Sequence, residues 1–397
     1  MLDSKFSPWP SFTDEEINSV KDVLISNKVN YWTGDECRKF EQEFAVWSDS
    51  KYAVSLANGT LALDIAFKAL EIGEGDEVIV TSRSYIASVT SIINSNAKPI
   101  FVDVDSESQN ITPSNVSAAI TSKTKAIVCV HLAGWPCQMD EIMDIANDNN
   151  LFVIEDCAQA HGAMYKGVSV GSIGHIGCWS FCQDKIMSTG GEGGMVTTND
   201  KSLWLKMWEY KDHGKSYQAV YNQKHPEGFR WIHESFGTNW RMTEIQGAIG
   251  RIQLNRMSEW TRVRNRNANI LIKHFENYAG EGGVIRIPML NNDKGSVHAY
   301  YKFYAFVSKE SLKNDWNRDR IVSEISSMGI PCMHGSCSEI YLEKAFDNTN
   351  LRPKERLPVA KKLGDSSIVF LVHPTLSEKE MKEIAKSAAN VLDKAKK

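Results

Sequence analysis

A lysine precedes a glycine-rich turn in the segment 179–194. Lys185 follows Ser180 by five residues, and four glycines lie between positions 190 and 194. Such a loop can hold the lysine amine close to an anion. The amine can form a Schiff base with a cofactor aldehyde and, once released, act as the base that moves a proton. A lysine taken alone is more often a surface residue on a flexible turn, so the interpretation depends on its neighbours.

An acidic residue ends an apolar run between residues 151 and 156. Asp156 closes this run, and Gln159 follows three residues later. An aspartate in this place can pair with the protonated ring nitrogen of pyridoxal phosphate (PLP) and keep the ring cationic. Gln159 is a candidate ligand for the ring hydroxyl. The alternatives are an aspartate that caps a helix and a solvated glutamine on that helix.

Two other turns follow apolar runs. Gly59 and Thr60 open a helical pattern, so their backbone amides are candidates for binding a phosphate at the positive end of the helix dipole. Thr60 as a helix cap is a competing account that is compatible with this role. Tyr85 follows the next run and can stack on a pyridine ring, or it can be an ordinary core residue.

These residues follow short apolar runs that alternate with helical patterns. Alternation of this kind predicts an α/β fold with a mostly parallel seven-stranded sheet and helices on both faces. Ligands of such sheets bind beyond the carboxyl ends of the strands, where the candidate residues lie. The predicted strands are 52–56, 77–81, 100–104, 126–131, 151–154, 178–181 and 195–198.

The two ends of the chain show a different organisation. Thr13 and Glu16 have the spacing of a capping box, which predicts a helix from residue 14. A long helix is predicted to begin near Thr243, and beyond it the pattern becomes a smaller mixed α+β segment. We therefore predict an N-terminal segment with a large domain at 1–255 and a small domain at 256–397.

The composition limits the classes of function. The chain has 397 residues, of which 42% are hydrophobic, and its formal net charge is −4. No basic stripe predicts nucleic-acid binding. No leader and no apolar stretch of about 20 residues is visible, so we expect a soluble cytoplasmic protein without membrane contact. Eight cysteines without a C-x-x-C pair predict reduced thiols and no metal site.

Together these motifs resemble the DegT/StrS family of sugar aminotransferases, a branch of the fold-type I PLP enzymes. The resemblance covers residues 12–384. Its most specific parts are Ser180-Phe181-x-x-x-Lys185 with Thr189-Gly-Gly-Glu192-Gly-Gly194, then Glu155-Asp156-x-Ala-Gln159, and Gly237-Thr-Asn239-Trp-Arg241-Met242-Thr-Glu244. The resemblance implies fold type I, a PLP cofactor, and a homodimer whose active sites lie at the subunit interface.

The resemblance also assigns roles to residues. Lys185 is the Schiff-base lysine, and pyridoxamine phosphate is the form of the cofactor that carries the amine between substrates. The implied cofactor ligands are Asp156 at the ring nitrogen, Gln159 at the ring hydroxyl, Tyr85 on the ring face, and Gly59, Thr60, Ser180 and the neighbouring subunit's Asn239 at the phosphate. The candidate substrate contacts are Trp32, His131, Trp135, His213, Arg230 and Tyr301.

The implied reaction moves the amino group of L-glutamate onto a nucleotide-linked keto sugar for a bacterial surface polysaccharide such as O-antigen or capsule. The acceptor is expected to be a 4-keto-6-deoxyhexose, with a 3-keto sugar as the second choice. The sequence departs from the family pattern at Cys182-Gln183-Asp184 and at Arg83, both near the expected substrate side. One relative with histidine in place of the lysine performs a 3-dehydration, so Lys185 favours transamination.

Three other functions remain alternatives. A PLP-dependent sugar dehydratase or other lyase would use the same scaffold. A nicotinamide-dependent oxidoreductase also has alternating strands and helices, but no G-x-G-x-x-G follows a predicted strand. A non-catalytic PLP-binding regulator would keep the cofactor without turnover.

Overall fold

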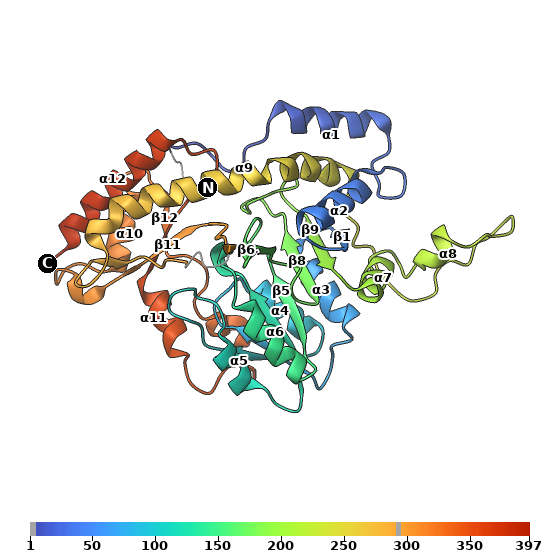
Figure 1. Cartoon of the computed structure of the whole chain (residues 1–397), viewed down its shortest axis with the longest axis horizontal. Helices are drawn as coiled ribbons and strands as arrows, with labels where there is room; N and C mark the ends of the chain where they lie inside the picture. Colours follow the sequence, from blue (N-terminus) through green and yellow to red (C-terminus); the bar gives the residue numbers. More distant parts are fainter. Residues whose placement is uncertain (1–4, 291–294) are drawn as a thin grey trace.

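The fold is centred on a seven-stranded sheet in the computed structural model, which describes residues 5–290 and 295–397 (Figure 1). The strand order is β1-β9-β8-β5-β4-β2-β3, and β9 runs antiparallel to both of its neighbours while the other neighbouring pairs are parallel. All seven predicted strands are confirmed, with ends shifted by no more than two residues. They are β1 Tyr52–Leu56, β2 Glu77–Thr81, β3 Lys98–Val102, β4 Thr124–Val130, β5 Phe152–Asp156, β8 Ile176–Ser180 and β9 Gly194–Thr198.

Helices cover both faces of this sheet, as the alternating pattern predicts. The α-helices of the described residues, including those of the small-sheet region, are α1 Asp14–Ser26, α2 Glu36–Trp47, α3 Gly59–Ala69, α4 Ala87–Asn94, α5 Pro113–Ala119, α6 Met139–Asp148, α7 Lys201–Tyr210, α8 Tyr217–Tyr221, α9 Glu244–Phe275, α10 Arg318–Ser326, α11 Pro358–Ser366 and α12 Glu378–Ala395. Alternate residues of β2 face opposite ways, so Val78 and Val80 belong to the apolar cluster that includes residues of α3, α4 and α7, while Ile79 belongs to the cluster with residues of α5 and α6.

A smaller antiparallel sheet follows the long helix. Its order is β10-β11-β13-β12, with β10 Ile285–Arg286, β11 Phe303–Val307, β12 Cys332–Met333 and β13 Ser367–Phe370. The end of α9, with α10 and α12, packs on it around a separate apolar core that also includes Phe6. A two-stranded hairpin, β6 Met164–Tyr165 and β7 Val168–Ser169, lies between β5 and β8.

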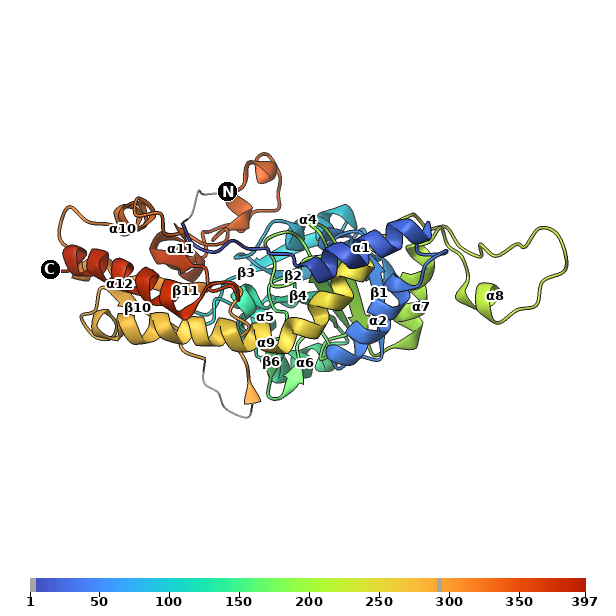
Figure 2. The same cartoon turned by 90° about the horizontal axis from the view of Figure 1, so that it is seen from above.

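Helix α9 connects the two sheets. It begins after Thr243, whose hydroxyl accepts the amide of Gln246, so the predicted start is confirmed. It packs on α1 and α2 at its beginning and on α12 towards its end, as Figures 1 and 2 show. The domain boundary predicted near residue 255 falls inside this continuous helix, so the division at that residue stays a prediction.

The first helix begins as predicted, at the capping box of Thr13 and Glu16. Val23 is buried, but Ile17 and Leu24 are 59% and 52% exposed, so only part of the apolar surface of α1 is covered in the single chain. No helix in the described part of the chain is long and apolar enough to cross a membrane.

Candidate active site

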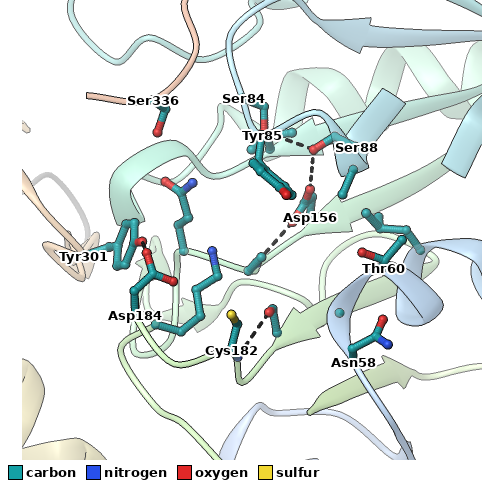
Figure 3. Close-up of a pocket in the computed structure, with 18 of the residues that line it drawn as sticks. Asn58, Thr60, Ser84, Tyr85, Ser88, Asp156, Cys182, Asp184, Tyr301 and Ser336 are labelled. Atoms are coloured by element: carbon teal, nitrogen blue, oxygen red, sulfur yellow. Dashed lines mark hydrogen bonds between the residues drawn. The ribbon is translucent and has the colours of Figure 1, made fainter. Parts of the chain in front are cut away.

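A cavity of about 800 Å³ lies where several strands of the large sheet end. Its walls come from the turns after β1 and β2, the carboxyl ends of β5 and β8, and two segments of the small-sheet region at 301–302 and 335–337 (Figure 3). Eight of the predicted site residues line it: Gly59, Thr60, Tyr85, Asp156, Gln159, Ser180, Lys185 and Tyr301.

The N-terminus of α3 forms one end of the cavity. Asn58 caps the helix, and its side chain accepts the amide of Leu61 at 3.0 Å. The amides of Gly59 and Thr60 lie in the first turn of α3, where no carbonyl of the helix can accept their hydrogen bonds. They are therefore free to bind an anion. Ser180 lies so close that an ideal Cβ at position 59 would be 2.5 Å from the serine Cβ. Glycine at 59 is therefore required by this close approach, and helix, amides and hydroxyl together form a cradle for an anion.

Asp156 ends β5 and is 5% exposed. Ser88 donates its hydroxyl to Oδ2 at 2.7 Å, and the amide of Ala158 donates to Oδ1 at 3.1 Å (Figure 3). Asp156 makes no ion pair with any residue of the described chain. Ser88 escaped the sequence reasoning, although it stands four residues after Ser84, whose hydroxyl lies 3.0 Å from its own. A buried carboxylate held by two neutral donors can accept a cation from the cavity.

Lys185 lies on the turn after β8 with its side chain at the cavity wall. Its amide donates to the carbonyl of Cys182 at 3.0 Å, and its carbonyl accepts the indole N–H of Trp9 at 2.8 Å. The amine makes no hydrogen bond with a described residue and lies 5.3 Å from the ring centroid of Tyr301. The backbone is fixed while the amine stays available for chemistry.

Tyr301 and Asp184 form a polar pair beside this lysine. The Tyr301 hydroxyl donates to Asp184 Oδ2, as Figure 3 shows. Burial raises the pKa of Tyr301 well above its usual value, and the charge of Asp184 raises it further. Burial also raises the pKa of Asp184, but the Lys185 charge and the Tyr301 hydrogen bond outweigh it and leave that pKa below its usual value. The phenol is therefore neutral and the carboxylate charged near neutral pH.

Gln159 and Tyr85 face the cavity in different ways. The Gln159 side-chain oxygen accepts the amide of Ala133 at 2.9 Å, which leaves its NH₂ group to donate into the cavity. Tyr85 is 66% exposed, so the alternative that it is an ordinary core residue is wrong. Its ring lies beside Ser84 and Asp156 in Figure 3, where it can cover a flat ligand.

The structure contradicts the prediction that His131 contacts substrate. The side chain is fully buried, its Nε2 lies 2.9 Å from Glu155 Oε2, and its Nδ1 accepts the amide of Cys137. Glu155 also accepts three backbone amides between residues 171 and 174, so the His131–Glu155 pair stabilises the buried core and does not face the cavity. Trp135 also lies outside the cavity, where its ring packs against that of His298 in a T-shaped contact. The structure therefore does not support Trp135 as a substrate contact.

The other predicted residues lie on or beside the segment 211–240, whose middle part projects from the body of the molecule with α8 (Figures 1 and 2). His213, Arg230 and Asn239 are exposed and do not line the cavity of their own chain. Trp32 packs on Trp208 and is likewise outside the cavity. A role for these residues in catalysis therefore requires the cavity of a second copy.

Three comparisons place the chain among known proteins. The profile of the DegT/DnrJ/EryC1/StrS aminotransferase family matches residues 10–388. GDP-perosamine synthase of Escherichia coli O157:H7 is 36% identical over 95% of this chain and 96% of its own. The X-ray structure of an aminotransferase from Psychrobacter cryohalolentis is 60% identical with a TM-score of 0.97, over 98% of this chain and 99% of its own. Spr1654 from Streptococcus pneumoniae in its PMP-form is 26% identical with a TM-score of 0.86, over 98% and 99%.

The PMP-form of that neighbour is the pyridoxamine state of PLP, and the residues of this cavity fit the same cofactor. Because Gly59 has no Cβ, the amides at the start of α3 and the hydroxyl of Ser180 lie close enough to bind one phosphate. Asp156 is a buried carboxylate that forms no ion pair with the described residues, which suits a protonated ring nitrogen. Lys185 supplies the amine for the aldehyde. The cofactor of this chain is pyridoxal phosphate.

Proposed function

The chain belongs to the DegT/DnrJ/EryC1/StrS aminotransferase family, and from this premise we propose that it moves the amino group of L-glutamate onto a nucleotide-linked keto sugar. The acceptor is a 4-keto-6-deoxyhexose, with a 3-keto sugar as the second choice, and the product serves a bacterial surface polysaccharide. The cytoplasmic location expected from the sequence is part of this proposal. Support for the sugar comes from the similarity to GDP-perosamine synthase along nearly the whole chain.

One observation carries the chemistry: Lys185 and Asp156 line one cavity whose end is the anion cradle at Gly59 and Ser180. Bound PLP supplies an aldehyde that takes up the amine and a ring that accepts electrons from the substrate carbon. Asp156, fixed by Ser88 and the amide of Ala158, keeps the proton on the ring nitrogen. The Lys185 amine, which lines the same cavity, would take up and return the proton released at the substrate carbon.

The cradle and the wall residues position these groups. The amides of Gly59 and Thr60 with the Ser180 hydroxyl hold the phosphate, because charge-assisted hydrogen bonds at a helix N-terminus are strong. Tyr85 covers the ring, and the NH₂ group of Gln159 donates to the ring hydroxyl. Loss of Lys185 should therefore stop both half reactions while the phosphate cradle still binds.

We propose a homodimer as the active form. Three large aromatic side chains on the projecting segment face solvent in the single chain: Phe229 at 88%, Trp231 at 86% and Phe236 at 100% exposure. Apolar surface of this extent favours burial against a second protein surface. In the proposed dimer, Asn239 and Arg230 reach the partner's cavity, and Asn239 binds the phosphate from the neighbouring subunit.

The experiment is a test in two steps with purified, PLP-loaded protein. L-glutamate alone should convert the cofactor absorbance to that of the pyridoxamine form, and a keto sugar should convert it back. A panel of UDP, dTDP and GDP keto sugars, with the ketone at carbon 3 or 4, then identifies the acceptor. A dehydratase would release water or ammonia without this conversion, and that result would contradict the proposal. Turnover by wild type and none by Lys185→Ala excludes a non-catalytic regulator.

A further inference from the structure

A second lysine lines the cavity beside Lys185. Lys302 follows Tyr301 just before β11, and its side chain is 21% exposed. Its Nζ lies 4.0 Å from Asp184 Oδ2 and makes no hydrogen bond with any residue of the described chain. Burial lowers the pKa of Lys302, because the charge is taken partly out of water, and Asp184 only partly offsets this effect. The amine therefore has hydrogen-bonding capacity that the chain itself leaves unused.

The two lysines lie near the same aromatic ring. Lys185 Nζ is 5.3 Å and Lys302 Nζ is 4.7 Å from the centroid of Tyr301. Among the described residues, Asp184 alone forms an ion pair with Lys302, and its Oδ2 already accepts the Tyr301 hydroxyl. Glu192 also lines the cavity but forms no ion pair with either lysine within the described residues. Two lysine amines and the single carboxylate of Asp184 therefore lie around the Tyr301 ring, and this local excess of positive charge suits an anion.

We propose that Lys302 binds the α-carboxylate of the amino donor, an inference that rests on the proposed transamination. An α-amino acid carries its amine and its carboxylate on one carbon. The group that binds the carboxylate must therefore lie close to the group that handles the amine, and Lys302 and Lys185 share one ring as their neighbour. A nucleotide sugar presents its diphosphate at carbon 1, across the sugar ring from a ketone at carbon 3 or 4, so its negative charge lies farther from the reacting atoms.

The test measures each ligand separately on the PLP-loaded protein. Glutarate, which has the carboxylates of glutamate but no amine to react, and GDP are titrated by calorimetry. The half-saturating L-glutamate concentration is taken from the rate of cofactor conversion without sugar. The variants are Lys302→Met, which removes the charge, Lys302→Arg, which keeps it, and Lys201→Met as a control at the start of α7, outside this cavity.

We expect Lys302→Met to weaken glutarate binding and to raise the half-saturating glutamate concentration by about 10- to 100-fold, the effect of one lost charge-assisted hydrogen bond. The conversion rate at saturating glutamate should change much less, Lys302→Arg should restore most of the affinity, and GDP binding should stay unchanged. An unchanged cofactor absorbance in each variant shows that the site is intact.

Two results would overturn this inference. Unchanged affinities for glutarate and glutamate in Lys302→Met would show that Lys302 does not bind the carboxylate of the donor. Weaker GDP binding with normal glutarate binding would assign Lys302 to the diphosphate instead. Failure of the wild-type protein to convert with any amino donor is a separate result, because it contradicts the proposed function before Lys302 is tested.

Discussion

Gly59→Ala tests how closely the chain packs around the cofactor phosphate. The ideal Cβ at this position lies 2.5 Å from Cβ and 2.8 Å from Oγ of Ser180, and 3.0 Å from its Cα. A methyl group therefore forces the start of α3 away from the end of β8, and overpacking of this kind costs about 1–3 kcal/mol. Once the two segments separate, the helix amides and the serine hydroxyl no longer reach the same phosphate.

The loss of one such charge-assisted hydrogen bond costs about 1.5–3 kcal/mol, so the Kd of PLP should rise about 10- to 100-fold. The assay removes the cofactor from the protein and follows its absorbance as PLP is added back. Gly73→Ala is the matched control, because the nearest atom to an ideal Cβ there is Ser95 O at 3.6 Å, an ordinary contact.

A double-mutant cycle identifies the cause. Ser180→Gly removes the two side-chain atoms that a methyl group at position 59 would meet, so Gly59→Ala should weaken PLP binding less in that background than in the wild type. Equal Kd values for Gly59→Ala and wild type, or an equal effect of Gly59→Ala in both backgrounds, would refute the reasoning.

Three further predictions follow from other parts of the molecule. Ser88→Ala removes one of the two hydrogen bonds to Asp156 and should lower the rate of glutamate conversion about tenfold or more, measured by stopped-flow absorbance. Burial lowers the pKa of His161 to about 3, so the folded state keeps this ring neutral. The contribution of this neutral ring to the free energy of unfolding is fully present above pH 6.5. It is lost as the unfolded chain takes up a proton on acidification, and the loss reaches about 2 kcal/mol by pH 5. His161→Phe should therefore reduce the fall in the unfolding midpoint between pH 7 and 5. Trp231→Asp should shift the protein from dimer to monomer in sedimentation velocity.

Each of these predictions has a control and a contradicting result. Thr90→Ala, also on α4, should leave the conversion rate unchanged because its hydroxyl bonds only the local carbonyl of Ala87. An equal acid sensitivity of wild type and His161→Phe would mean that this imidazole is not the buried neutral group described. Met328→Asp, a partly exposed apolar site in the small-sheet region, should leave the dimer intact, and a dimeric Trp231→Asp protein would remove the projecting segment from the interface.

The sheet could be predicted from the sequence because its information is local. Each strand is a short apolar run, and the carboxyl ends of parallel strands meet at one edge, so Gly59, Tyr85, Asp156 and Lys185 could be placed at one site from their positions after those runs. The structure brings all four to one cavity.

The features that the sequence did not predict depend on contacts between distant positions. Ser88, which was not predicted, lies 68 positions from Asp156, and the pairing of the predicted Tyr301 with Asp184 joins positions that are 117 apart. The local sequence around Ser88 or Tyr301 does not indicate which distant residue the side chain contacts. The close approach of Gly59 to Ser180 is likewise a property of packing, because many strand-to-helix turns contain a glycine for other reasons.

The error at His131 has a specific cause. His131 ends the predicted strand 126–131 and was a candidate substrate contact, but Glu155 on the neighbouring strand β5 binds its ring inside the core. No local pattern around position 131 distinguishes a side chain in the core from one at the ligand edge. Asn239 raises a different difficulty, because its predicted site lies in a second subunit that one chain does not contain. His213 and Arg230 were predicted as substrate contacts without a choice of subunit, and neither lines the cavity of its own chain.

The most direct test of the central claim is the absorbance of PLP-loaded protein mixed with L-glutamate in the absence of any sugar. The wild-type protein should pass from the aldehyde form to the pyridoxamine form, and Lys185→Ala should not do so on the same time scale. A wild-type spectrum that stays unchanged with glutamate, or a Lys185→Ala protein that converts as fast as wild type, would contradict the account.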